Sequence, residues 1–140
     1  MIDSCQFCNL ANGVEFANIV YQTDYVCCFL DIDPIHEGHT LIVPKKHMLD
    51  IEESDEATRL DIMNTAALLS KALKTHYHPD GISMMQNGGY FNDVNHYHMH
   101  VFPRYKNDGF SWVEPICPHK KQTTAAEVAS YLQKTIKELS

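Results

Sequence analysis

The feature that most constrains the fold is a run of three histidines at two-residue spacing, His96, His98 and His100. Side chains alternate between the two faces of a β-strand, so a strand would place all three imidazoles on one face. The residues between and after them are apolar or aromatic, which is the period-two pattern of a half-buried strand. A helix would scatter the imidazoles around its surface. We therefore predict a strand whose row of imidazoles lets one small ligand contact two or three of them.

Length and composition indicate one globular domain. The chain has 140 residues, of which 44% are hydrophobic and 21% charged, as is ordinary for a globular core. A formal charge of −7 with 11 basic residues argues against a nucleic-acid partner or an anionic membrane, because both need clustered positive charge. No apolar run approaches the about 18 residues of a membrane span, and the first residues do not resemble a signal peptide. We expect a single domain over residues 1–140, cytoplasmic, with neither kind of partner.

Strand and helix signals alternate in a way that predicts an α+β fold. We expect a hairpin with a short polar turn, a third strand that stops at Pro44, a helix from Ser54 as its N-cap to about residue 76, and a short strand before the histidines. A capping box at Thr124 and Glu127 predicts a final helix. The predicted strands before the histidines cover residues 19–21, 25–30, 39–43 and 82–85.

Two segments resemble the histidine-triad (HIT) family. The histidines with Val101 and Phe102 match its signature, His-x-His-x-His followed by two apolar residues, and residues 29–47 resemble the first half of the family core in the family's order. The resemblance covers about residues 5–104 and leaves 105–140 as a C-terminal extension. It implies an antiparallel sheet of about five strands, with a central helix and a C-terminal helix against one face. It also implies a homodimer in which two sheets become one.

The resemblance further implies a nucleotide hydrolase or nucleotidyl transferase that acts at the α-phosphate of a nucleoside 5′-phosphate derivative. His98 would be the nucleophile and would form a covalent nucleotidyl-histidine. His100 would donate to the phosphate or to the leaving group, and His39 would complete the proton network. Dinucleoside polyphosphates, nucleoside phosphoramidates and nucleotide sugars share the nucleotidyl half, so the leaving group stays open.

The resemblance implies that Asp31 binds the ribose hydroxyls of the nucleotide. An ionised carboxylate only accepts hydrogen bonds, so it can take both hydroxyl protons of a ribose. Alternatively, Asp31 merely starts the turn before Pro34. The resemblance also implies that Phe29 and Ile32 form the wall beside the base.

The loop before the histidines departs from the family pattern, which ends in Gly-Gln-Ser/Thr. Asn92 can imitate the glutamine, but an ionised Asp93 in place of the hydroxyl would repel phosphate. The full predicted nucleotide-binding set is Phe29, Asp31, Ile32, Asn87, Asn92, Asp93, His98 and His100.

Cys5 and Cys8 form a Cys-x-x-Cys pair that can reach one zinc ion, although structural zinc needs two more ligands. A redox pair would follow a strand, and nothing upstream of Cys5 supplies one. Resemblance to zinc-bearing relatives implies that His47 and His96 complete a structural tetrahedral site. The alternative is two free thiols and an exposed His47.

Two other functions stay open. In one, His98 and His100 are ligands of a catalytic metal; in the other, the protein binds nucleotides for regulation with little turnover. Cys117 and His119 are interpreted as ordinary surface groups.

Overall fold

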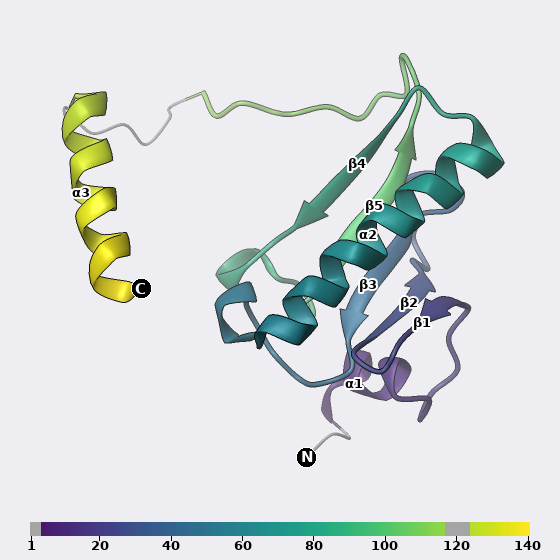
Figure 1. The fold of residues 1–140 in the computed structure, drawn as a ribbon. Coiled ribbons are helices and arrows are strands. Elements are labelled where there is room, and N and C mark those ends of the chain that lie inside the picture. The colour runs from purple at the N-terminus through teal and green to yellow at the C-terminus, as the bar shows by residue number, and fades with distance from the viewer. Residues whose placement is uncertain (1–3, 117–123) are drawn as a thin grey trace. The chain divides into compact units, whose positions relative to one another are not determined.

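The computed structural model describes residues 4–116 and 124–140, so Cys117 and His119 lie outside the described residues. One compact unit ends at Asp108 and a second begins at Gly109. The second unit contains α3 (Ala125–Leu139). The first unit contains, in chain order, α1 (Gln6–Ala11), β1 (Ile19–Gln22), β2 (Val26–Leu30), β3 (Thr40–Pro44), the 3₁₀ helix η2 (Ile51–Glu53), α2 (Glu56–Tyr77), β4 (Gly81–Gln86), the 3₁₀ helix η3 (Gly89–Phe91) and β5 (Met99–Arg104) (Figure 1).

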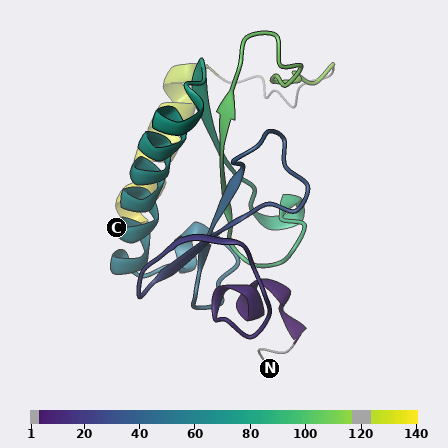
Figure 2. The ribbon, with the colours of Figure 1, turned by 90° about the vertical axis from the view of Figure 1, so that its right-hand side faces the viewer.

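The five strands form one antiparallel sheet in the order β1-β2-β3-β5-β4. This confirms the predicted α+β, HIT-like architecture. Helix α2 runs along one face of the sheet, and the short α1 lies on the other side (Figure 2). The sequence predicted α2 but no helix at α1, where the six residues are too few to carry a helical hydrophobic period.

Alternate side chains of β2 point to opposite faces of the sheet and contribute to a hydrophobic cluster on each face. Val26 and Cys28 pack toward α2, whereas Cys27 and Phe29 pack on the side of α1. The predicted apolar stripe of α2 is confirmed as core, since its four members are buried. They are Ile62, Ala66, Leu69 and Leu73.

The predicted N-cap of α2 is wrong by one residue. Asp55 is the N-cap, and its carboxylate accepts from the backbone N–H of Thr58 at 2.8 Å. Ser54 instead donates its hydroxyl to the carbonyl of Ile51 at 2.6 Å and closes η2. A carboxylate is the stronger partner for the positive end of a helix, so Asp55 takes the position.

The histidine strand is shorter than predicted, because ladder pairing begins at Met99 and includes only His100 of the three histidines. The neighbouring strand β3 ends in Pro44, which has no N–H for the ladder. Alternation nevertheless extends upstream: Tyr97 packs with Val101 in the core that faces α2, and its N–H donates to the carbonyl of Met48 at 2.7 Å. The three imidazoles therefore share the opposite face.

Helix α3 begins with the predicted capping box. Thr124 accepts from the N–H of Glu127, and the Glu127 carboxylate accepts from the N–H of Thr124. None of its residues is buried. Within the described part of the chain, no helix combines the length and the apolar character that crossing a membrane requires.

Candidate functional site

A cavity of about 530 Å³ lies between α1 and the sheet, within the size range of small-molecule sites. Its apolar wall includes Phe7 and Leu10 of α1 together with Phe29, Leu41 and Ile32. The cavity also has four ionisable lining residues. These are Asp31, Asp93, His98 and His100.

The tautomer of His98 is fixed by its backbone partner. Its Nδ1 lies 2.9 Å from the carbonyl oxygen of His96, and a carbonyl can only accept, so Nδ1 carries the proton. Nε2 is therefore the nitrogen with a free lone pair, and it lies 3.6 Å from Asp93 Oδ1 at the cavity. The Phe7 ring stands edge-on to the imidazole, with centroids 5.3 Å apart. This arrangement presents a basic nitrogen in a fixed orientation.

A chain of hydrogen bonds sets the protons of His39 and His100. The N–H of Ile35 donates to His39 Nδ1 at 3.0 Å, so the proton of the neutral ring is on Nε2, which lies 2.9 Å from His100 Nδ1. His100 therefore accepts at Nδ1 and carries its proton on Nε2. Burial, with smaller contributions from neighbouring imidazoles, lowers the pKa of His100 to about 4, and burial also lowers the pKa of His39. Both rings are neutral at neutral pH, and His100 presents one N–H donor.

The two carboxylate oxygens of Asp31 have different surroundings. Oδ1 accepts from the N–H of Asp33 at 2.9 Å, which is a turn contact. Oδ2 lies 3.6 Å from His39 Nε2 and 3.8 Å from His100 Nδ1, and the side chain lines the cavity. The turn interpretation and the ligand interpretation thus apply to different oxygens of one side chain.

The structure does not bring all predicted nucleotide ligands together. Phe29 and Ile32 line the cavity, and so does Asp93. Asn87 and Asn92 are not among its lining residues. The buried Asn92 instead accepts from the N–H of Val94 at 3.2 Å and donates to the carbonyl of Leu49 at 3.5 Å, so it braces its own loop. For the two asparagines a direct nucleotide contact stays a prediction.

Sequence reasoning missed the contribution of α1 to the cavity, which comes from Gln6, Phe7 and Leu10. Helix α1 is anchored next to the sheet by Phe7, whose ring stands edge-on to Phe29 with centroids 5.5 Å apart. The sequence signal that could have found these residues is their position in and just after the Cys-x-x-Cys pair. If Cys5 and Cys8 share a metal ion with His96, the residues next to the cysteines must also lie beside the histidine strand.

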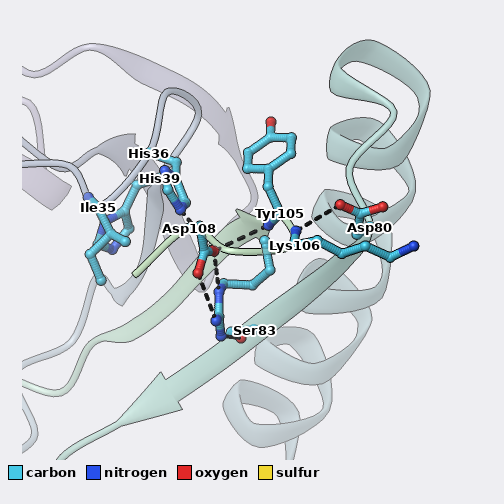
Figure 3. Close-up of polar contacts among 9 residues, drawn as sticks. Ile35, His36, His39, Asp80, Ser83, Tyr105, Lys106 and Asp108 are labelled. Carbon is cyan, nitrogen blue, oxygen red and sulfur yellow. Dashed lines mark hydrogen bonds and ion pairs between the residues drawn. The ribbon is translucent and has the colours of Figure 1, made fainter. Parts of the chain in front are cut away.

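A second missed feature is the polar cluster that holds the loop between β2 and β3 (Figure 3). The Asp108 carboxylate is only 5% exposed and accepts from His36 Nε2 at 3.0 Å. It also accepts from Arg104 Nε at 2.7 Å and Nη2 at 3.1 Å. Because Ile35 precedes His36, these contacts steady the N–H that fixes the His39 tautomer.

The four predicted metal ligands converge at the other end of the histidine run. Cys5, Cys8, His47 and His96 offer ligand atoms that all lie within 4.8 Å of one another. His96 donates from Nε2 to the carbonyl of Pro44 at 2.8 Å. Its Nδ1 lone pair therefore faces the cluster, and burial lowers the pKa of this ring to about 4.

The distances within this cluster are close to those between the ligands of a tetrahedral ion. His96 Nδ1 lies 3.4 Å from each cysteine sulfur and 3.2 Å from His47 Nδ1, and Cys8 Sγ lies 3.3 Å from His47 Nδ1. Ligands of tetrahedral zinc are about 3.3–3.8 Å apart, given bond lengths of about 2.0–2.3 Å. Burial and the adjacent Cys5 raise the pKa of the Cys8 thiol to about 11, so metal binding would release a proton from it. The four side chains present can fill all four coordination positions of a tetrahedral metal ion.

Comparison with known proteins identifies the family. The family model described as HIT domain matches residues 12–107. The crystal structure of a HIT family protein from Bacillus anthracis superposes with a TM-score of 0.84 at 32% identity, covering 99% of this chain and 98% of that one.

Two further relatives bear on the site. A zinc-bound histidine triad family protein from Mycobacterium smegmatis has a TM-score of 0.73 at 27% identity, over 99% of this chain and 97% of that one. Adenosine 5′-monophosphoramidase hnt1 of Schizosaccharomyces pombe is 28% identical over 136 residues, which are 93% of this chain and 99% of the relative. The chain belongs to the HIT family.

Proposed function

We propose that the protein is a hydrolase or nucleotidyl transferase that acts at the α-phosphate of a nucleoside 5′-phosphate derivative, with His98 as the nucleophile. The observation that carries the proposal is the contact of His98 Nδ1 with the carbonyl of His96 at 2.9 Å. It leaves the Nε2 lone pair at a cavity of nucleotide size. A neutral imidazole held in one tautomer is the form required for attack on phosphorus.

The reaction divides into two displacements. First, the His98 Nε2 lone pair forms a bond to the α-phosphorus, and the bond to the leaving group breaks, with its electron pair departing on the leaving group. Then water attacks the same phosphorus, the histidine–phosphorus bond breaks, and its electron pair returns to Nε2 as the water gives up a proton to solvent. His100 Nε2–H is the donor available to the phosphoryl oxygens, because its Nδ1 is occupied by His39 at 2.9 Å.

The ribose of the nucleotide would bind Asp31 Oδ2, the oxygen not used by the turn. The base would lie against Phe29 and Ile32 in the apolar part of the cavity. The similarity to adenosine 5′-monophosphoramidase hnt1 of fission yeast supports a substrate with this nucleotidyl half.

A structural zinc ion is part of the proposal. Cys5, Cys8, His47 and His96 would hold it, and it would stabilise the junction between the N-terminal segment and the histidine strand. The support is the ligand set and its spacing, together with the zinc-bound relative. His98 takes no part in this cluster.

The metalloenzyme alternative receives less support. In the described residues, the groups able to hold a metal are the cysteine-containing cluster and a set made of Asp31, His39 and His100. Neither contains His98, so a catalytic metal on the His98–His100 pair lacks a third ligand.

The regulatory alternative is favoured by one observation, the Asp93 carboxylate 3.6 Å from the nucleophilic nitrogen. The negative charge of this carboxylate would repel a phosphate that approaches the nitrogen, which would slow turnover.

We also propose a cytoplasmic homodimer. The four described cysteines are free thiols, which suits a reducing compartment. Strand β4 is an open edge of the sheet, and an open edge can pair with the same edge of a second copy. Light scattering coupled to size exclusion measures the mass directly.

Trapping of the covalent intermediate tests the proposed reaction. The wild-type protein, denatured at alkaline pH during turnover of a labelled nucleotide derivative, should carry an acid-labile nucleotidyl adduct that peptide mapping assigns to His98. A chelator applied under conditions that leave the fold intact should not abolish adduct formation. Turnover without any adduct, or an adduct on another residue, contradicts the proposal.

A further inference from the structure

The contact between His39 and His100 holds one proton, which can belong to either ring. His39 Nε2 lies 2.9 Å from His100 Nδ1, and between two neutral imidazoles one nitrogen donates and the other accepts. Asp31 Oδ2 is 3.6 Å from the first nitrogen and 3.8 Å from the second, so its charge hardly distinguishes the two arrangements. The N–H of Ile35 does distinguish them, because it donates to His39 Nδ1 at 3.0 Å and so requires the His39 proton to be on Nε2.

The two arrangements give His100 opposite properties at the cavity that it lines. With the shared proton on His39, His100 carries its own proton on Nε2 and offers a donor to a phosphoryl oxygen. With the shared proton on His100 Nδ1, the neutral ring has a bare Nε2, whose lone pair repels a phosphoryl oxygen. Protonation of the whole ring would supply both N–H groups, but burial lowers the pKa of His100 to about 4. The N–H of Ile35 therefore decides whether neutral His100 can donate to phosphate.

A buried carboxylate connects the loop that contains Ile35 to the sheet (Figure 3). His36, the next residue, donates from Nε2 to Asp108 Oδ2 at 3.0 Å, and the Asp108 side chain is only 5% exposed. The same carboxylate accepts from Arg104, the last residue of β5, at 2.7 Å and 3.1 Å. Arg104 in turn donates from Nη1 to the hydroxyl of Ser83 on β4 at 3.0 Å. The loop is thus attached to the two strands at one edge of the sheet.

Strand β5 carries both ends of this arrangement, since His100 accepts the proton of His39 and Arg104 holds Asp108. We propose that Asp108 is a positioning residue of the site: it holds the N–H of Ile35 in place and thereby keeps a donor on His100 Nε2. Its effect on turnover rests on the proposed function. Its effect on the position of the proton is a property of the folded protein alone, and the two can be measured separately.

The expected effect on turnover is moderate, because the loop also has a contact of its own. The N–H of His39 donates to the carbonyl of His36 at 3.1 Å and closes the turn. Removal of one donor to a transition-state oxygen costs about 10²–10³ in kcat, and a loop that is displaced part of the time loses part of that. Replacement of Asp108 should therefore lower kcat by about tenfold. KM should change less, because the contacts proposed for base and ribose remain.

Nitrogen-15 NMR of the histidine side chains reads the position of the proton without any substrate. In the wild-type protein, His39 and His100 should both show a protonated Nε2 and a bare Nδ1. Asp108→Asn keeps the shape and removes the charge, and it should move both rings toward the tautomer that is protonated on Nδ1. The values of kcat and KM for adenosine 5′-phosphoramidate then measure the consequence for turnover.

Two variants of His36 test the same contact from its other side. His36→Phe keeps a ring beside Tyr105, whose centroid is 5.3 Å away, but it removes the donor, so it should reproduce Asp108→Asn. His36→Gln supplies an N–H near the position of Nε2 and should keep the wild-type tautomers. Asp80→Asn is the matched control, because it removes the same charge from a neighbouring carboxylate that accepts from the N–H of Lys106 at 2.8 Å (Figure 3).

Wild-type tautomers in folded Asp108→Asn and His36→Phe overturn the role of Asp108. An equal shift in Asp80→Asn does so too, as does a shift in His36→Gln that matches the one in His36→Phe. If Asp108→Asn does not fold, the two His36 variants decide. A change of tautomer with no loss of kcat overturns the link to turnover. If the wild-type protein turns over no nucleoside 5′-phosphate derivative, the proposed function fails, and the NMR shifts still decide whether Asp108 positions the proton.

Discussion

His96 and His98 are two residues apart on the same face of one strand, yet they hold opposite tautomers. His96 donates from Nε2 to the carbonyl of Pro44 and turns Nδ1 toward two cysteines and His47. His98 donates from Nδ1 to the carbonyl of His96 and turns Nε2 toward the cavity. The difference teaches that the role of each imidazole is set by the carbonyl that takes its proton. The His96 ring presents a bare Nδ1 to the cysteine cluster, and the His98 ring presents a bare Nε2 to the cavity.

Replacing His98 should have the largest effect and distinguishes its proposed role from that of His96. His98→Ala should lower turnover of nucleoside 5′-phosphate derivatives by about 10³-fold or more, because a covalent mechanism loses its nucleophile. Metal content and circular dichroism should be preserved. His76→Ala, which alters an exposed imidazole on α2, is the matched control and should keep full activity. Turnover that persists in His98→Ala would rule out this residue as the nucleophile.

The proposed role of His96 as a metal ligand is tested by replacing Cys5, a ligand of the same proposed site. The wild-type protein should contain about one zinc per chain, and Cys5→Ser should lower zinc affinity by more than about 100-fold, since even partners outside the ligand set are worth about 10–100-fold. The melting temperature should fall with it. Cys27→Ala, a buried thiol outside the cluster, should lower stability without loss of metal. Elemental analysis that finds zinc retained after both Cys5 and Cys8 are replaced would refute the site.

Burial of neutral His100 should appear as a pH dependence of stability. Its pKa is about 4 in the folded protein against an ordinary value of 6.5, so the unfolded chain binds the proton more tightly. The stabilisation is complete above pH 6.5 and is lost as the pH falls toward 4, by up to about 3 kcal/mol. Urea unfolding of wild type and His100→Gln at each pH isolates this contribution, because losses from the metal cluster are common to both. Parallel curves for the two proteins would contradict it.

The smallest effect concerns Asp31, which has one oxygen in a turn and the other in the cavity. Asp31→Asn should weaken nucleotide binding by about tenfold, the loss of a charge-assisted hydrogen bond, while the fold stays intact. Calorimetric titration with ribo- and 2′-deoxynucleotides makes the test specific. The loss should be smaller for the deoxy ligand, and equal losses would return Asp31 to a purely turn-forming role.

The fold and the clustering of site residues could be predicted wherever the pattern is periodic or the spacing is strict. The histidine spacing indicated a common face, and the stripe of Ile62 and Leu69 indicated the core of α2. The cysteine pair and two distant histidines were grouped by resemblance, and they do meet in the structure.

The remaining details depend on tertiary contacts that no local pattern encodes. Helix α1 has six residues and is held by Phe7 against the sheet, so its place on the cavity was not predictable. Asn92 points into its own loop because Leu49 and Val94 offer it partners. The tautomers depend on carbonyls at Pro44 and His96, whose positions follow from where the ladder of β5 ends.

Nitrogen-15 NMR of the histidine side chains tests the central claim most directly, because protonated and bare imidazole nitrogens have well-separated shifts. For the neutral rings, the account predicts a protonated Nδ1 and a bare Nε2 in His98, and the reverse in His96 with Nδ1 bare or bound to metal. His98→Ala and His96→Gln assign the signals. A protonated Nε2 on neutral His98 would leave no lone pair for phosphorus and would contradict the account.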